Sequence, residues 1–168
     1  MLRLISTAAI AVLLLGPAQA QLPDPDYTTL TMTEAGIDLT VQPANCSPAA
    51  DCPSFVLMCV SGAVELLARN LRVTHVERWI VSDENAVLVM GNAVLGFSSV
   101  VTAEDPDRNW TARTTPVQEP SSFLSGMGFG GEIVIQTPFF VFRAPPSATD
   151  VGNLAAFGAE CLAAMPAE

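Results

Sequence analysis

Much of the chain that follows residue 20 consists of short runs of apolar and threonine residues, of which the run at 71–81 alternates with a period of two and the run at 55–60 is continuously apolar. Short alternating runs rich in threonine and β-branched residues, separated by Gly, Ser, Asn or Asp, are typical of strands joined by tight turns. The runs predict strands at 27–33, 36–42, 55–60, 63–69, 71–81, 86–90, 93–102, 110–114, 133–137 and 139–143. Ser61-Gly62 and Gly91-Asn92 have the two-residue spacing of hairpin turns. We therefore expect a mostly antiparallel sheet built as a meander of hairpins.

The period changes to that of a helix near the C-terminus. Ser147 is a suitable N-cap, and apolar residues recur from Val151 to Leu162 on one side of a helix that extends to about Ala164. A shorter helix is expected from the Pro120-Ser121-Ser122 cap to about Leu124. The predicted fold class is therefore α+β, with the sheet packed by the C-terminal helix.

The first twenty residues have a different pattern. Arg3 precedes an apolar run from Leu4 to Leu15, which is followed by a Gly16-Pro17 break and by Ala18-Gln19-Ala20. This order is typical of a secretory signal peptide with an A-x-A cleavage site. The apolar run is shorter than the roughly twenty residues that a membrane-spanning helix needs. An uncleaved anchor helix is the alternative.

Cleavage near Ala20 would release a periplasmic or secreted protein. Residues 1–20 are then the signal peptide, and residues 21–168 form a single exported domain whose residues 21–26 are a Pro-rich leader. No later run is apolar and long enough to span a membrane, so we expect no transmembrane segment after cleavage.

The charge balance is strongly acidic. The chain has 17 Asp and Glu residues, no lysine, and a net charge of −10, which becomes −11 when Arg3 is removed with the signal peptide. This balance argues against binding to nucleic acid or anionic lipid, because both need clustered positive charge. A cationic partner would be attracted, although acidity also keeps an exported protein soluble.

Four cysteines predict disulfides, because an oxidising compartment favours an even number of paired thiols. The spacings between Cys46, Cys52 and Cys59 do not fit a zinc site, and prolines stand where a redox-active C-x-x-C helix would begin. The favoured pairing joins Cys46 to Cys52 and Cys59 to Cys161, with Cys46 to Cys161 as the competing choice. The longer bridge would tie an early strand to the C-terminal helix.

Two patterns that can indicate chemistry are weak. Residues 126–131 satisfy G-x-G-x-x-G, but they follow a helix-like piece and precede a strand, whereas a dinucleotide loop follows a strand and opens a helix. We expect a turn there, and no cofactor or metal. His75 is the only histidine, so a small hydrolase would have to use it, with Glu77 as its orienting acid.

Two segments are candidate interfaces. Arg72, Arg78 and Trp79 lie on the predicted strand at 71–81, and Arg and Trp dominate the energetics of many protein interfaces. The glycine-rich loop, represented by Gly126 and Gly128, is the second candidate, because such loops can line binding faces.

Several short motifs between Ser54 and Leu162 resemble those of small exported bacterial proteins. They are S-F-V-L-M-C-V-S-G-A-V-E-L, N-W, S-F-L-S-G, G-E-I-V-I-Q-T-P, F-V-F-R-A and A-F-G-A-E-C-L, in that order. The set is similar to the VasI-like periplasmic accessory proteins associated with type VI secretion. The resemblance implies scaffold roles for Cys59, Trp110, Phe142 and Cys161. The Cys46–Cys52 loop and the Pro-rich leader depart from the pattern.

The sequence thus favours a non-enzymatic exported protein that binds an envelope or secretion-system protein. The resemblance implies an accessory or binding role and no catalytic residues. Two alternatives are a small periplasmic hydrolase that uses His75 and an inhibitor of a cationic cell-wall hydrolase. The oligomeric state does not follow from the sequence.

Overall fold

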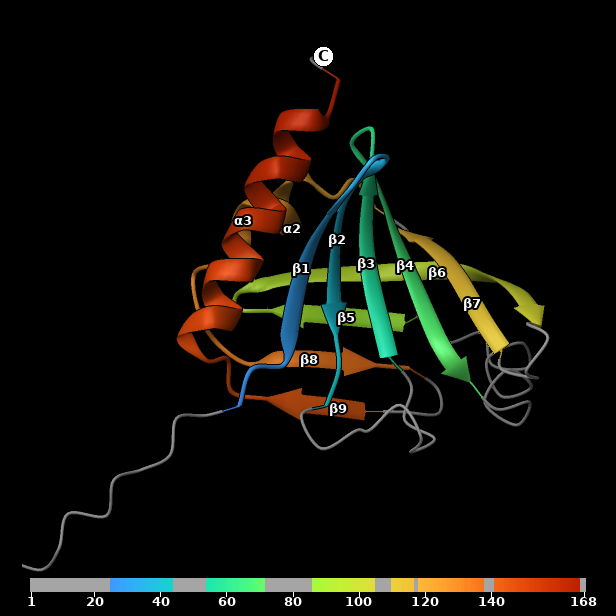
Figure 1. The fold of residues 1–168 in the computed structure, drawn as a ribbon, viewed down its shortest axis with the longest axis horizontal. Helices are drawn as coiled ribbons and strands as arrows, with labels where there is room; N and C mark the ends of the chain where they lie inside the picture. Colours follow the sequence, from blue (N-terminus) through green and yellow to red (C-terminus); the bar gives the residue numbers. More distant parts are fainter. Residues whose placement is uncertain are drawn as a thin grey trace, which may run out of the picture.

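The computed structural model describes residues 25–43, 54–71, 86–104, 110–116, 118–137 and 141–166. Within these residues the chain forms nine strands and two helices (Figure 1). The strands are β1 (Thr28–Thr33), β2 (Gly36–Val41), β3 (Ser54–Val60), β4 (Ala63–Leu71), β5 (Ala86–Met90), β6 (Ala93–Glu104), β7 (Trp110–Pro116), β8 (Ile133–Gln136) and β9 (Val141–Ala144). The helices are α2 (Ser121–Gly126) and α3 (Ala148–Ala164). The predicted α+β class is confirmed.

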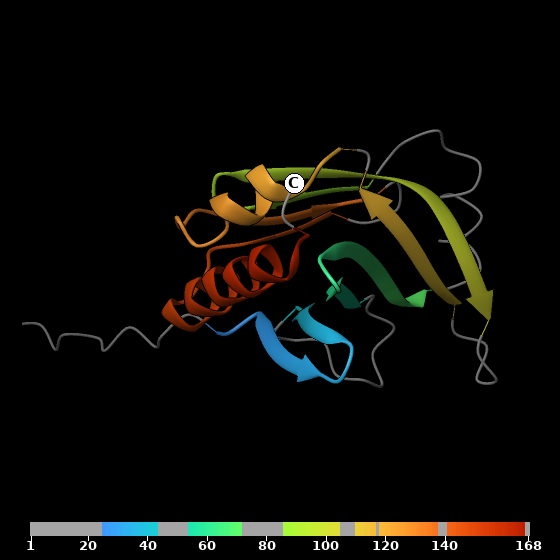
Figure 2. The same ribbon diagram turned by 90° about the horizontal axis from the view of Figure 1, so that it is seen from above.

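The strands are hydrogen-bonded in the order β1-β2-β3-β4-β7-β6-β5-β8-β9, and each pair is antiparallel. The first four strands follow one another as a meander. β4 then pairs with β7, and the sequence order runs backwards to β5 before the β8–β9 hairpin. Figures 1 and 2 show that this sheet folds over itself, so that β1 to β4 form one layer and β5, β8 and β9 lie in the other.

The long strand β6 connects the two layers. Residues Ala93 to Phe97 pair with β5, whereas Val101 to Glu104 pair with β7, and the register shifts between Ser98 and Val101. A second register shift between β4 and β7 includes Asn70, whose φ of 58° is left-handed. Bulges bend and twist a strand, which is how a sheet turns a corner.

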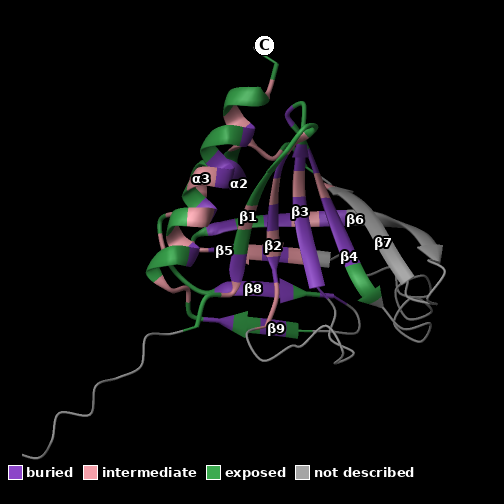
Figure 3. Cartoon of the chain, viewed as in Figure 1, coloured by how far each residue is buried: buried purple, intermediate pink, exposed green. Residues whose placement is uncertain are grey.

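The core lies between the layers, and the alternation seen in the sequence supplies it. Ile37, Leu39 and Val41 of β2 are buried, while Asp38 and Thr40 between them are only half-buried. Figure 3 shows buried positions along β3, β4, β5 and β8, and exposed positions along the outer side of α3. The opposite layer contributes Leu88, Met90, Leu95, Phe97, Ile133 and Ile135 to the same core.

Helix α3 lies at one side of the molecule between the two layers, beside β1 (Figure 2). Its buried side consists of Asp150, Leu154, Phe157, Gly158 and Cys161. Gly158 allows α2 to approach closely, because a Cβ at this position would lie 2.4 Å from the Leu124 carbonyl oxygen. The helix therefore packs on α2 as well as on β1, β2 and β3.

Several predictions fall outside the described residues. They concern the strand at 71–81 beyond Leu71 and the residues Cys46, Cys52, Arg72, His75, Arg78 and Trp79. Their proposed pairing, catalytic and interface roles stay predictions. Of the scaffold positions implied by the resemblance, Cys59, Phe142 and Cys161 are buried, and Trp110 begins β7.

Candidate binding surface around helix α3

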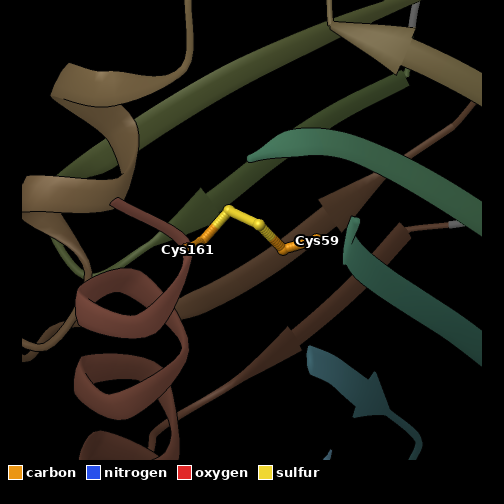
Figure 4. The surroundings of a disulfide bond; sticks show 2 residues. All are labelled: Cys59 and Cys161. Carbon is orange, nitrogen blue, oxygen red and sulfur yellow. A yellow bond between two sulfur atoms is a disulfide. The ribbon is translucent and has the colours of Figure 1, made fainter. Parts of the chain in front are cut away.

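A disulfide fixes the C-terminal half of α3. Cys59 of β3 and Cys161 are bonded, with their Cα atoms 5.7 Å apart (Figure 4). Both side chains are buried. This confirms one predicted bridge and shows that the competing pairing of Cys46 with Cys161 is wrong. A covalent bond therefore holds the helix against the C-terminal end of β3.

A buried carboxylate fixes the N-terminal end of α3. Asp150 Oδ1 accepts hydrogen bonds from the backbone N–H groups of Tyr27 (2.9 Å) and Thr28 (2.7 Å) and from Thr28 Oγ1 (2.7 Å). Its Oδ2 accepts from the Ser147 backbone N–H, and Ser147 Oγ accepts from the Asp150 N–H. The three bonds to Oδ1 join the helix to the start of β1 and the residue before it, and the two bonds between Asp150 and Ser147 form a capping box.

Neighbouring side chains extend this cluster. Asn153 Nδ2 donates to both the carbonyl oxygen and Oγ1 of Thr28, each at 3.1 Å, and Ser147 Oγ donates to Asp26 at 2.6 Å. The Tyr27 ring meets the Phe142 ring of β9 edge to face, with centroids 5.6 Å apart. The start of β1 is therefore tied to both α3 and the second layer.

The hydrogen bonds determine the ionisation of Asp150. Burial raises the pKa of this carboxyl, but the bonds from Thr28, Ser147 and Tyr27 outweigh it, so the net pKa lies below its ordinary value of 3.8. Because its oxygens are occupied by structural donors, Asp150 is a structural carboxylate and not a general base.

The exposed side of α3 is flanked by two hollows. The first, the α2–α3 groove, has a volume of about 270 Å³ and is mostly apolar. Its lining residues are Leu124, Ser125, Met127, Gly128, Phe129, Ala155, Ala159 and Leu162. Phe129 stands at its rim with 75% of its surface exposed.

The second hollow, the Glu34–Glu160 pocket, lies on the other flank of α3 and has a volume of about 340 Å³. Its lining residues are Met32, Thr33, Glu34, Ala35, Gly36, Ile37, Cys59, Ser61, Glu160 and Ala164. Met32 is 67% exposed, whereas Ile37 and Cys59 are buried. The pocket thus combines apolar and polar lining residues, two of which are carboxylates.

A low ridge separates the two hollows. With 3.6 residues per turn, Ala163 lies on the outer face of α3 between Ala159, which lines the groove, and Glu160, which lines the pocket. Both Ala163 and the neighbouring Ala159 are exposed. Because their side chains are short, a partner that crosses α3 can contact the groove and the pocket together.

The glycine-rich loop is required for packing. A Cβ at Gly128 would lie 2.7 Å from the Ala155 Cβ, and one at Gly126 would lie 3.0 Å from the Ala93 Cβ. Gly128 also has a φ of 92°, which disfavours other residues. The loop follows α2 and precedes β8, as expected of a turn. An interface role for Gly126 and Gly128 stays a prediction, although Gly128 borders the α2–α3 groove.

Phe129 and Met32 were not among the binding residues predicted from the sequence. A phenylalanine between two glycines, and a methionine that breaks a run of threonines in a strand, are weak signals by themselves. They gain meaning only through the structure, which places each of them, largely exposed, beside a hollow; a single exposed apolar residue is common on protein surfaces, whereas apolar binding grooves are not.

Among the described residues, no three or more His, Cys, Asp or Glu side chains are placed to hold a metal ion. No helix in the described ranges has the length and apolar character needed to cross a membrane. Comparison with protein-family models, with curated proteins and with solved structures finds no match to this chain.

Proposed function

We propose that this protein is a non-enzymatic exported binding or accessory protein that contacts another protein through the surface around α3. One observation carries the proposal: Phe129 and Met32 are largely exposed beside two hollows on the flanks of one helix. Aromatic residues and methionine are enriched in protein interfaces, and such interfaces are organised around a few apolar anchors.

The rigidity of this surface supports the same function. The disulfide holds α3 on β3, and the capping and Asp150 bonds hold its other end. A surface that is already ordered loses less conformational entropy when a partner binds. The partner belongs, in this proposal, to the cell envelope or a secretion system, as the sequence resemblance and the expected export imply.

Site-specific photocrosslinking in cells tests the proposal. A photoreactive amino acid replaces Phe129, and a second strain carries it at Val141, an apolar side chain of β9 that is 56% exposed. We expect one envelope protein to be crosslinked from position 129 and not from position 141, and to be identified by mass spectrometry. The same products from both positions, or none from position 129, would contradict the proposal.

The partner obtained in this way is then purified for titration calorimetry. Replacement of a central aromatic anchor weakens many interfaces by at least about tenfold. Phe129→Ser should therefore weaken binding by about this factor, while Val141→Ser leaves the affinity unchanged.

A further inference from the structure

The Glu34–Glu160 pocket has an electrostatic character that the α2–α3 groove lacks. Glu34 comes from the turn between β1 and β2, and Glu160 comes from α3, so the fold brings together two carboxylates that are far apart in the sequence. None of the described residues that line either hollow is basic. Neither glutamate makes an ion pair with another described residue.

The C-terminal end of α3 makes the electrostatic potential in the pocket more negative still. Ala164, the last residue of the helix, also lines the pocket. The C-terminus of a helix carries about half a negative charge from its free carbonyl groups, and basic residues in the last turn normally compensate it. The last turn of α3 has no basic residue, and Glu160 stands just before it. This arrangement is unfavourable for the isolated helix and favourable for a bound cation.

The interior of the pocket fits the remainder of a basic side chain. Met32, Ala35 and Ala164 are exposed and supply apolar surface, with Met32 67% exposed. Lysine and arginine have long aliphatic stems that cover apolar surface while the charged group stays near water and carboxylates. A hollow lined by both apolar side chains and carboxylates matches both parts of such a side chain.

We propose that the Glu34–Glu160 pocket accepts a Lys or Arg side chain of the partner protein, while an apolar side chain of the same segment enters the α2–α3 groove. This inference rests on the proposed function and specifies the partner's chemistry. The two hollows lie on opposite flanks of α3, about 10 Å apart for a helix of ordinary diameter. An extended segment covers that distance in about three residues.

The net charge of the chain supports this choice of partner. The net charge is −10 and the chain has no lysine. The whole protein therefore attracts a cationic segment from farther away than the pocket alone can, which increases the rate of encounter. The pocket then determines where the positive charge is placed, and the short side chain of Ala163 between the two hollows lets the segment pass across α3.

Two short peptides test the pocket directly. The first is the acetylated, amidated peptide Leu-Ser-Ser-Arg, and the second replaces arginine with citrulline, which has nearly the same shape and no charge. Binding is followed by NMR through the Met32 methyl group and the Ser61 amide. We expect both signals to shift with the arginine peptide, and the citrulline peptide to bind about three- to tenfold more weakly, as exposed ion pairs contribute modestly.

A charge-matched pair of variants locates the effect. Glu34→Gln/Glu160→Gln should weaken binding of the arginine peptide by about three- to tenfold. Asp38→Asn/Glu132→Gln removes the same charge from positions that line neither hollow, and it should leave the affinity within about twofold of the wild type. Raising the salt from about 0.1 M to about 1 M should reduce the difference between the two peptides, because screening shortens the range of the charges.

The possible outcomes separate this inference from the proposed function. Equal binding of the two peptides, absence of any shift at Met32, or equal loss in both double variants would overturn the pocket assignment. The affinity of the variants for the partner captured through position 129 is an independent test. If Phe129→Ser weakens its binding and Glu34→Gln/Glu160→Gln does not, the protein is a binding protein whose partner presents no basic side chain here. If neither variant affects it, the proposed function fails as well.

Discussion

The two ends of helix α3 are held in different ways. At the N-terminal end, Asp150 is buried and hydrogen-bonded to the first residues of β1, and polar groups are matched by partners. At the C-terminal end, a buried disulfide holds the helix, yet Phe129 and Met32 on its flanks remain largely exposed. The exposed apolar side chains are therefore not what fixes the helix, and in the function proposed above they are available to a partner.

Among the variants proposed for the two ends of α3, removal of the disulfide should lower the free energy of unfolding the most. The loop between Cys59 and Cys161 spans 102 residues, and closing a loop of that length stabilises the folded state by about 4 to 5 kcal/mol in the loop-entropy model. Cys59→Ala/Cys161→Ala should lower the free energy of unfolding in urea by about that amount.

The wild-type protein treated with a reductant is the control for this double variant. Both should unfold at similar urea concentrations if the loss arises from the bridge, although reduction also reaches any bond between Cys46 and Cys52. A loss below about 1 kcal/mol would mean that packing of Leu154 and Phe157 holds α3 without the bridge, and the contrast between the two ends would disappear.

The bridge was predictable from the sequence because few arrangements of four cysteines suit a strand and a helix. The hairpins and α3 were predictable for a similar reason, since their periodicity is local. The folding of the sheet into two layers was not, because it depends on register shifts near Ser98 and Asn70. A bulge changes the alternation by one residue, which is too small a signal to separate from ordinary variation.

The residues of the candidate surface were harder to predict from the sequence than the two layers of the sheet. Glu34 and Glu160 are far apart in the chain, and only the packing of α3 beside the β1–β2 turn brings them to one pocket. Asp150 follows Ser147 at the spacing of a capping box, so a local role was foreseeable. Its bonds to Tyr27 and Thr28 are not, because they join residues more than a hundred positions apart.

Replacing Asp150 tests the polar end and should have the next largest effect. Asn keeps one acceptor oxygen, but its NH₂ group would face the Ser147 N–H, and the charge that strengthens these bonds is lost. Since hydrogen bonds to charged groups contribute about 1.5 to 3 kcal/mol, Asp150→Asn should lower the free energy of unfolding by about 2 to 3 kcal/mol at neutral pH.

The pH dependence identifies the charge as the cause. Because the pKa of Asp150 is lower in the folded than in the unfolded protein, its stabilisation is complete well above pH 3.8 and is lost as the pH falls through the folded pKa. The difference between wild type and Asp150→Asn should therefore be constant near neutrality and shrink in acid. A difference independent of pH would exclude the charge as the cause.

Replacing the exposed apolar residues should have the smallest effect on stability. Met32→Ser/Phe129→Ser should change the free energy of unfolding by less than about 0.5 kcal/mol, because surface substitutions remove little buried area. Phe123→Ala, a buried aromatic residue of α2, provides the contrast and should destabilise by about 3 to 5 kcal/mol. Urea unfolding of all three proteins gives the comparison.

This result decides how the binding experiments are interpreted. Suppose that the double variant is as stable as the wild type but no longer binds the purified partner that crosslinking identified. Phe129 and Met32 then contribute to binding and not to folding. A loss above about 1 kcal/mol would show that these side chains help to hold the groove and the pocket in shape. The two ends of α3 would then both be structural, and the exposure of its C-terminal flanks would need a cause other than a partner.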